Sequence, residues 1–406
     1  MLKRKTIRET KHPATDVFSK SLWKKRHFSS QYVLFLIFPL IPIILVVLWS
    51  GNKHADPSHD SLVHPPGSVL TEKLSTMPKT KDLRPFDPNS QSQATNSIKL
   101  DLIQQDELIT STSTVVTAYF TLKSKFAKEE YIKWMSNMLS LQDAMIIFTS
   151  HEMIDTMQSL RSHATNRTVI IPFDLNQLEL VQKYDTKFWE HQLDIDPEKR
   201  IHRSYELFWI WLSKSFFVNQ AIQLNPYQSE IFMWSDIGCY RNSRYRSKQM
   251  IVQIPLIPED RILQMAHHEP RPPPYIWWND KYTQKPLFYH SGSQMIGYKD
   301  TWIRFHGEYL KTVEGFVQRD MFLGEDQTVL QSTCLRVTSL CAYVPFSQVS
   351  DNHYFGLRYV LHFGGKFDYW YPPEGLPVER SDVTNKSLLD PMKPPPPMGR
   401  AKFLAA

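Results

Sequence analysis

The chain has 406 residues, of which 42% are hydrophobic and 13% aromatic, so it is long enough and apolar enough to bury a sizeable core. Its formal net charge of +6 is concentrated at the N-terminus, because residues 1–30 alone carry +7 and the remaining residues sum to about −1. The body therefore gives no electrostatic reason to expect a nucleic-acid partner.

Residues 31–49, "QYVLFLIFPLIPIILVVLW", contain no charged side chain. At about 1.5 Å per residue, a helix of this length just crosses a bilayer core. Pro39 and Pro42 argue against a buried soluble helix, and no small-residue cleavage site follows the segment. The sequence predicts a type II signal anchor, with the basic residues 1–30 in the cytoplasm and the body in the lumen of the Golgi or ER.

The segments that flank the body are polar and rich in proline. Residues 50–110 are predicted to be a disordered lumenal stem, residues 111–371 the folded domain, and residues 372–406 a disordered tail. Sequons at Asn166 and Asn385 suit a lumenal glycoprotein. In an oxidising lumen, Cys239, Cys334 and Cys341 can form one pair with one cysteine left over, or no pair.

The first half of the body alternates strands and helices. Strands are predicted at 114–120, 144–150, 167–173 and 230–236, and helices at 129–141, 151–163 (with Ser150 as its cap) and 204–224. This order implies an α/β fold with a mainly parallel sheet covered by helices. Further strands are predicted at 251–257, 275–278 and 287–297, followed by a helix whose apolar face runs from Trp302 to Phe316.

The first candidate site is the end of the strand at 230–236. Ligands of open α/β sheets bind beyond the carboxyl ends of the strands, and Asp236 stands at such an end. Its carboxylate suits a divalent metal or a ribose hydroxyl, Gly238 lets a ligand approach the backbone, and Arg241 suits a phosphate. The alternative interpretation, of about equal weight, is that Asp236 caps a turn and that Arg241 is a solvated surface residue.

The second candidate is "LGEDQTVL", where Glu325 and Asp326 begin a predicted helix. A carboxylate at a helix N-terminus stays ionised and can act as a general base toward a hydroxyl, or it simply caps the helix.

Other segments carry weaker signals. Gly292 and Gly297 mark either a close approach to a sugar or phosphate, or a plain turn. Lys214 can be interpreted as a contact to a phosphate or as a side chain that extends to the surface. His362 can be interpreted as a metal ligand or as a structural residue. The pair of tryptophans at 277–278 stacks on a sugar or belongs to the core.

The order of these pieces resembles the bacterial HtrL/YibB family over about residues 113–365. The resemblance is carried by "VVTAYF", "SKSFFVNQAIQLNPYQSEIFMWSDIGCYR", "SGSQMIG" and "GEDQTVL", in that order. Its most specific part is a block of spaced residues, namely Asn225, Pro226, Phe232, Trp234, Asp236, Gly238 and Arg241.

The resemblance implies a GT-A-like, Rossmann-like glycosyltransferase that takes a UDP- or GDP-linked sugar donor and a glycan or protein acceptor. It implies Mn²⁺ or Mg²⁺ at the strand-end Asp236, and Asp326 as the base, with Glu325 orienting the acceptor. Many enzymes of this fold carry Asp-x-Asp, whereas the third position here is Gly238, so His362 or Glu325 would have to complete the metal site. The alternative function is a non-catalytic lumenal protein that binds glycans or a partner.

Overall fold

A computed structural model describes residues 108–122, 128–202, 204–266, 276–277 and 290–378. The predicted cytoplasmic tail, the predicted anchor at 31–49, nearly all of the stem and residues 379–406 lie outside these ranges. No helix within the described ranges has both the length and the apolar character needed to cross a membrane. The predicted type II topology is therefore untested and stays a prediction.

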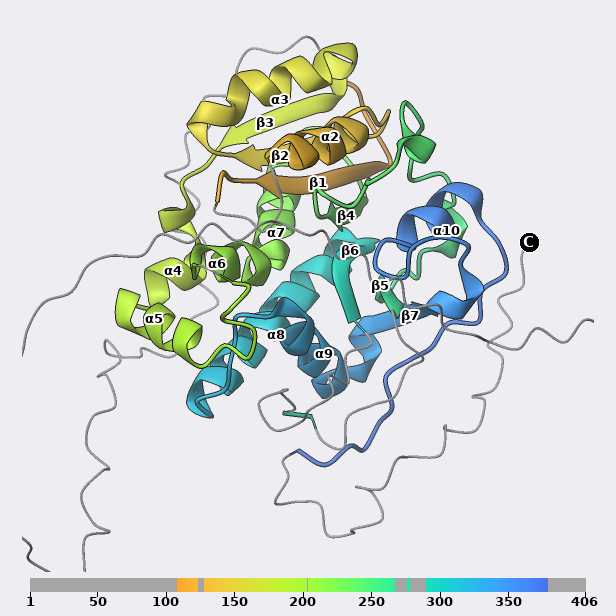
Figure 1. Cartoon of the computed structure of the whole chain (residues 1–406). Coiled ribbons are helices and arrows are strands. Elements are labelled where there is room, and N and C mark those ends of the chain that lie inside the picture. Colours follow the sequence, from red (N-terminus) through yellow and green to blue (C-terminus); the bar gives the residue numbers. More distant parts are fainter. Residues whose placement is uncertain (1–107, 123–127, 203, 267–275, 278–289, 379–406) are drawn as a thin grey trace, which may run out of the picture. The chain divides into compact units, whose positions relative to one another are not determined.

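In the described part of the chain, the body is built on a seven-stranded sheet with the order β3-β2-β1-β4-β6-β5-β7 (Figure 1). The strands are β1 (Ser113–Tyr119), β2 (Ala144–Thr149), β3 (Thr168–Pro172), β4 (Ile231–Ser235), β5 (Ile262–Ala266), β6 (His290–Tyr298) and β7 (Cys341–Pro345). Strand β6 runs antiparallel to both of its neighbours, and the other pairings are parallel. The predicted α/β fold with a mainly parallel sheet is confirmed.

Helices cover both faces of the sheet, because strand residues point alternately to one face and the other. On one face, Val115 of β1 and Met233 of β4 join an apolar cluster with α2 (Lys128–Leu139), α3 (Ile154–Arg161) and α10 (Leu357–Phe363). On the other, Val116 and Trp234 join a cluster with α4 (Glu179–Lys183), α5 (Thr186–Asp194), α6 (Glu206–Leu212), α7 (Lys214–Leu224), α8 (Lys299–Gln318) and α9 (Asp326–Arg336).

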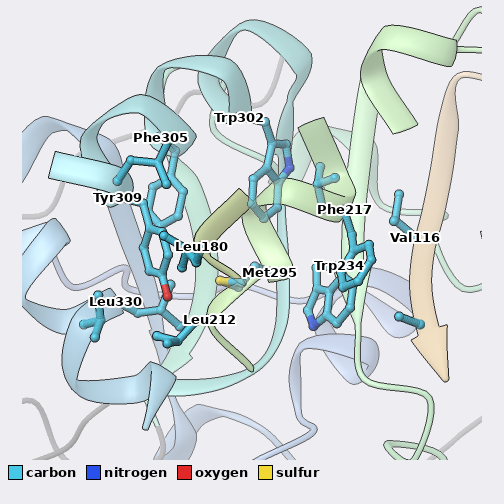
Figure 2. Packing of buried hydrophobic residues seen from close by; sticks show 14 of the residues in the cluster. Val116, Leu180, Leu212, Phe217, Trp234, Met295, Trp302, Phe305, Tyr309 and Leu330 are labelled. Carbon is cyan, nitrogen blue, oxygen red and sulfur yellow. The ribbon is translucent and has the colours of Figure 1, made fainter. Parts of the chain in front are cut away.

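The second cluster is rich in aromatic rings. Figure 2 shows Trp234 of β4 beside Phe217 of α7, and their rings stack with centroids 5.9 Å apart. Trp302 and Phe305, from the predicted apolar face of α8, are fully buried in the same cluster. These rings fix α7 and α8 against β4, which is the strand that ends in Asp236.

The predicted single helix at 204–224 is two helices. Helix α6 ends at Leu212 and α7 begins at Lys214, with Ser213 between them at φ −99° and ψ 10°. The break makes Lys214 the first residue of a helix rather than a residue in the middle of one. The predicted cap Ser150 precedes a short 3-10 helix, His151–Met153, and its hydroxyl bonds to the Glu152 carboxylate instead of capping a backbone N–H.

The prediction of a strand at 251–257 is wrong. Ile254–Leu256 forms a 3-10 turn that contains Pro255, which cannot donate a hydrogen bond to a sheet ladder. The strand follows later as β5, and all of its residues are buried. Residues 276–277 belong to no strand. Trp277 packs its ring against Phe316 of α8, beneath the guanidinium of Arg319, which agrees with the interpretation of this residue as part of the core.

A disulfide joins Cys334 near the end of α9 to Cys341 at the start of β7, and Cys239 is a buried free thiol. Of the arrangements that the sequence left open, the structure has one pair and one cysteine left over. The disulfide ties the helix that begins with Asp326 to the edge strand of the sheet.

Candidate functional site

Asp236 directly follows β4, at the carboxyl end of the parallel strands. Its side chain lies on the same face of the sheet as that of Trp234, two residues earlier, because strand side chains alternate. The indole Nε1 of Trp234 donates to Asp236 Oδ1 at 2.9 Å, and the Asp236 backbone N–H donates to the Ser293 carbonyl on β6 at 2.8 Å. A ring and a strand backbone therefore hold the carboxylate toward the face that α7 covers.

Lys214 meets Asp236 from α7. Its Nζ lies 3.1 Å from Oδ1 and 3.3 Å from Oδ2 of Asp236, and it donates to the Gly292 carbonyl at 2.8 Å. A cation at the first position of a helix opposes the helix dipole, which favours negative charge at the N-terminus. The surrounding oxygen atoms offset that unfavourable placement.

Asp326 completes the group from the start of α9. Its Oδ2 lies 2.6 Å from Lys214 Nζ, the shortest of the ion-pair distances around that ammonium. Asp326 is the first residue of α9, as the sequence predicted, and the helix dipole favours a carboxylate at this position. Gln327, the next residue, donates to the His290 carbonyl at the start of β6 and so anchors the first turn of α9 to the sheet. We call Lys214, Asp236 and Asp326 the charged triad.

The members of the charged triad differ in exposure. The side chains of Lys214 and Asp326 are 5% and 8% exposed, whereas that of Asp236 is 36% exposed. Burial raises the pKa of Asp236, the nearby Lys214 ammonium lowers it, and the Asp326 charge raises it again; the net direction is upward. Burial would lower the pKa of Lys214, but Asp236 and Asp326 raise it above its usual value. Asp236 is thus the member of the charged triad that a ligand can reach, and the Lys214 ammonium lies directly behind it.

The structure brings together Asp236, Lys214 and Asp326, which the sequence named in separate segments. Glu325 is the N-cap residue of α9. The pKa of Tyr354 is raised mainly by burial and, to a smaller extent, by the negative charge of Glu325. Its side chain is therefore near the loop that carries Tyr354. The predicted role of Glu325, to orient an acceptor, stays a prediction.

Gly238 and Arg241 lie beside α2. A Cβ at Gly238 would meet the rings of Trp134 and Tyr131 at 3.7 and 3.9 Å, which is ordinary contact. The protein itself therefore does not require a glycine there. The Arg241 guanidinium lies 4.5 Å from the Trp134 ring and 5.0 Å from the Phe355 ring. Stacking of this kind holds the guanidinium plane, and the predicted contact with a phosphate stays a prediction.

His362 does not join Asp236. Its Nδ1 bonds with the Gln249 carbonyl at 2.8 Å, and its ring packs on Tyr245 and Phe363. Within the described ranges, no hydrogen bond or ion pair links His362 to Asp236, and no group of three or more His, Cys, Asp or Glu side chains is arranged to hold a metal ion. The structural interpretation of His362 fits these contacts.

The residues of the charged triad do not fit the implied divalent cation. Mn²⁺ and Mg²⁺ need several oxygen ligands around one point. Both oxygens of Asp236 and Oδ2 of Asp326 already lie within 3.3 Å of one ammonium. A metal ion at the same oxygens would stand beside that ammonium and repel it. No chemical step is therefore assigned to a metal here.

Sequence reasoning missed Arg358, which holds the loop after Asp236. Its Nε and Nη2 donate to the two oxygens of Asp351 at 2.9 and 3.0 Å, and its Nη1 donates to the Cys239 carbonyl. Its side chain is 2% exposed, and Tyr245 donates to the same Asp351 carboxylate. The partners are far apart in the sequence, so no local pattern indicated the network. Gly292, by contrast, was named from the sequence, because a glycine inside a strand often marks a close approach. The sequence did not indicate that its carbonyl accepts a hydrogen bond from Lys214.

We expect Arg358→Lys to lower the free energy of unfolding by about 1–3 kcal/mol, because lysine cannot reproduce the buried bidentate hydrogen bonds to Asp351. Urea unfolding of the purified variant measures the loss. Arg304→Lys is the control, since exposed Arg304 donates to a backbone carbonyl and should change stability by less than about 0.5 kcal/mol. Equal effects of the two substitutions would contradict a holding role for Arg358.

The comparisons with known proteins agree with the resemblance. The model of the family described as "Bacterial protein of unknown function (HtrL_YibB)" matches residues 111–341, more than half of the chain. The chain belongs to this family. It is 23% identical over 154 residues to protein HtrL of Escherichia coli K12, an alignment that covers 32% of this chain and 53% of that protein. The chain thus spans about half the length of the curated relative that it matches.

A similar solved structure is the apo form of mouse xyloside xylosyltransferase 1. It is 10% identical, with a TM-score of 0.32, and the match covers 56% of this chain and 83% of the mouse chain.

Proposed function

We propose that this protein is a glycosyltransferase with a GT-A-like domain that moves a sugar from a UDP- or GDP-linked donor to a hydroxyl of a glycan or protein. The observation that supports this proposal best is the charged triad at the carboxyl ends of the parallel strands. Strand β4 lies on one side of β1 while β2 and β3 lie on the other, and ligands of open α/β sheets bind at such a switch in strand order.

The proposed roles follow from exposure and charge. Asp236, which is 36% exposed, would accept hydrogen bonds from hydroxyls of the donor. Lys214 would balance part of the negative charge of both acids, because its ammonium pairs with each of them. Asp326 would accept the proton of the acceptor hydroxyl, and Arg241 would face the diphosphate. The predicted compartment is the lumen of the Golgi or ER, and the disulfide between Cys334 and Cys341 supports an oxidising environment.

The test is a panel of nucleotide sugars offered to the full-length protein, with acceptor mixtures, in EDTA and in added Mn²⁺. We expect release of the nucleotide from one donor class. Asp326→Asn should lower kcat by about 10²–10⁴-fold with the donor KM nearly unchanged, because it removes a base. Asp236→Asn should instead raise the donor KM.

The control is Asp320→Asn, which alters an exposed carboxylate paired with His191 and should leave both constants unchanged. If no donor is turned over, yet UDP, GDP or a glycan raises the melting temperature, the protein is the non-catalytic binding protein instead.

A further inference from the structure

The ammonium of Lys214 is surrounded by oxygen atoms in the way that a bound cation is. Three groups contribute them: the Gly292 carbonyl at 2.8 Å, Asp326 Oδ2 at 2.6 Å and the Asp236 carboxylate at 3.1 and 3.3 Å. An ammonium has three N–H donors and no acceptor. It donates hydrogen bonds to the Gly292 carbonyl and to Asp236, and it forms an ion pair with Asp326, so three oxygen-bearing groups surround it.

This arrangement is held in place from several sides. Lys214 is the first residue of α7 and its side chain is 5% exposed, so it has little room to swing away from the acids. Gly292, at φ +61°, places its Cα against Asp326 so closely that a Cβ would lie 2.8 Å from Oδ2. The backbone at Gly292 therefore lies close against the Asp326 carboxylate and leaves no space there for a larger residue.

The charges of the site also suit an ammonium. Asp-x-Asp motifs bring a second strand-end carboxylate, but Gly238 stands at that position here. Asp236 and Asp326 together carry two negative charges, and Lys214 supplies one positive charge directly between them. A divalent ion that used the same oxygens would have to displace a buried lysine that has no other partner of opposite charge among its described contacts.

We infer that the Lys214 ammonium takes the place of the divalent cation at this site, so that the two carboxylates bind Mn²⁺ only when that ammonium is removed. The inference about the charges does not depend on the proposed function, but its meaning for catalysis does. If the proposed function holds, transfer of the sugar would proceed without a metal.

The test is a titration of Mn²⁺ against the full-length protein without nucleotide, followed by the electron paramagnetic resonance signal of free Mn²⁺. We expect the wild type to leave this signal unchanged. Lys214→Ala and Lys214→Gln should each gain one Mn²⁺ per chain, and Mn²⁺ should raise their melting temperature, because a ligand that binds only the folded state stabilises it. Glutamine keeps much of the lysine's volume and one donor group, so this variant covers the case in which the alanine variant does not fold.

Adding Asp326→Asn to either variant should abolish the gain. The inference is overturned if the wild type binds one Mn²⁺ through these acids, or if the folded variants gain none. These outcomes are independent of the donor panel: a chain that gains Mn²⁺ in the variants but turns over no donor keeps the inference and loses the proposed function.

Discussion

Replacing Lys214 with alanine is expected to lower the free energy of unfolding by about 3 kcal/mol near neutral pH, because a broken buried ion pair leaves charge uncompensated. Asp326, whose side chain is 8% exposed, would then face Asp236 without a cation between them. The loss is placed at the low end of the usual range because Asp236 is 36% exposed and water screens part of its charge. Urea unfolding measures it.

The loss should depend on pH in a definite direction. Burial already raises the pKa of Asp236 in the folded protein, and the Lys214 ammonium is the largest influence that lowers it. Without the ammonium this pKa rises further above its unfolded value. The folded variant then binds more protons than the unfolded chain, so its stability falls as pH rises through the folded pKa. The variant should accordingly recover toward the wild type as the pH is lowered from neutral.

Lys311→Ala provides the matched control. Lys311 is 57% exposed and pairs with Glu308 one turn away on α8, so its loss should cost less than about 0.5 kcal/mol at any of these pH values. A Lys214 variant as stable as this control, or one that weakens on acidification, would rule out the charged triad as a buried ion-pair network.

Gly292→Ala should cost about 2–4 kcal/mol, since it combines a left-handed backbone with a collision. The φ of Gly292 is +61°, and the added Cβ would lie 2.8 Å from Asp326 Oδ2. The Asp326 side chain cannot move aside cheaply, because Lys214 holds it at 2.6 Å. The substitution should therefore also disturb the proposed base, and thermal unfolding together with the donor assay would record both effects.

Gly307→Ala is the control that separates the local effect at Gly292 from the effect that any glycine-to-alanine substitution has on stability. Nothing lies within 4 Å of a Cβ at Gly307, which sits inside α8. Alanine there should stabilise the protein by about 0.5–1 kcal/mol through helix propensity. If Gly292→Ala proved as harmless, the close approach of β6 to Asp326 would not matter for the fold.

Local patterns in the sequence predicted the elements that carry the two acids. The apolar runs around β1 to β4 are long and bounded by polar turns, so their strand character and parallel order could be recognised. Asp236 and Asp326 were found because each stands at an element boundary, where ligands and charges gather. Their position relative to each other could not be found this way, because it depends on a sheet that pairs β4 with β6.

The features that sequence reasoning missed depend on contacts between distant residues. The apolar character of 204–224 is continuous, so nothing local indicated that the chain would break at Ser213 and start a new helix with Lys214. Strands β5 and β7 are short, and they pair with each other across a long stretch of chain. Arg358 was missed for the same reason, since its partners Asp351 and Cys239 come from separate loops.

The use of the Gly292 carbonyl as a partner of Lys214 has an evolutionary consequence. A main-chain oxygen survives every substitution, so one of the three contacts of that lysine cannot be deleted by a point mutation, only displaced. Genome searches keyed to Asp-x-Asp would pass over chains built in this way.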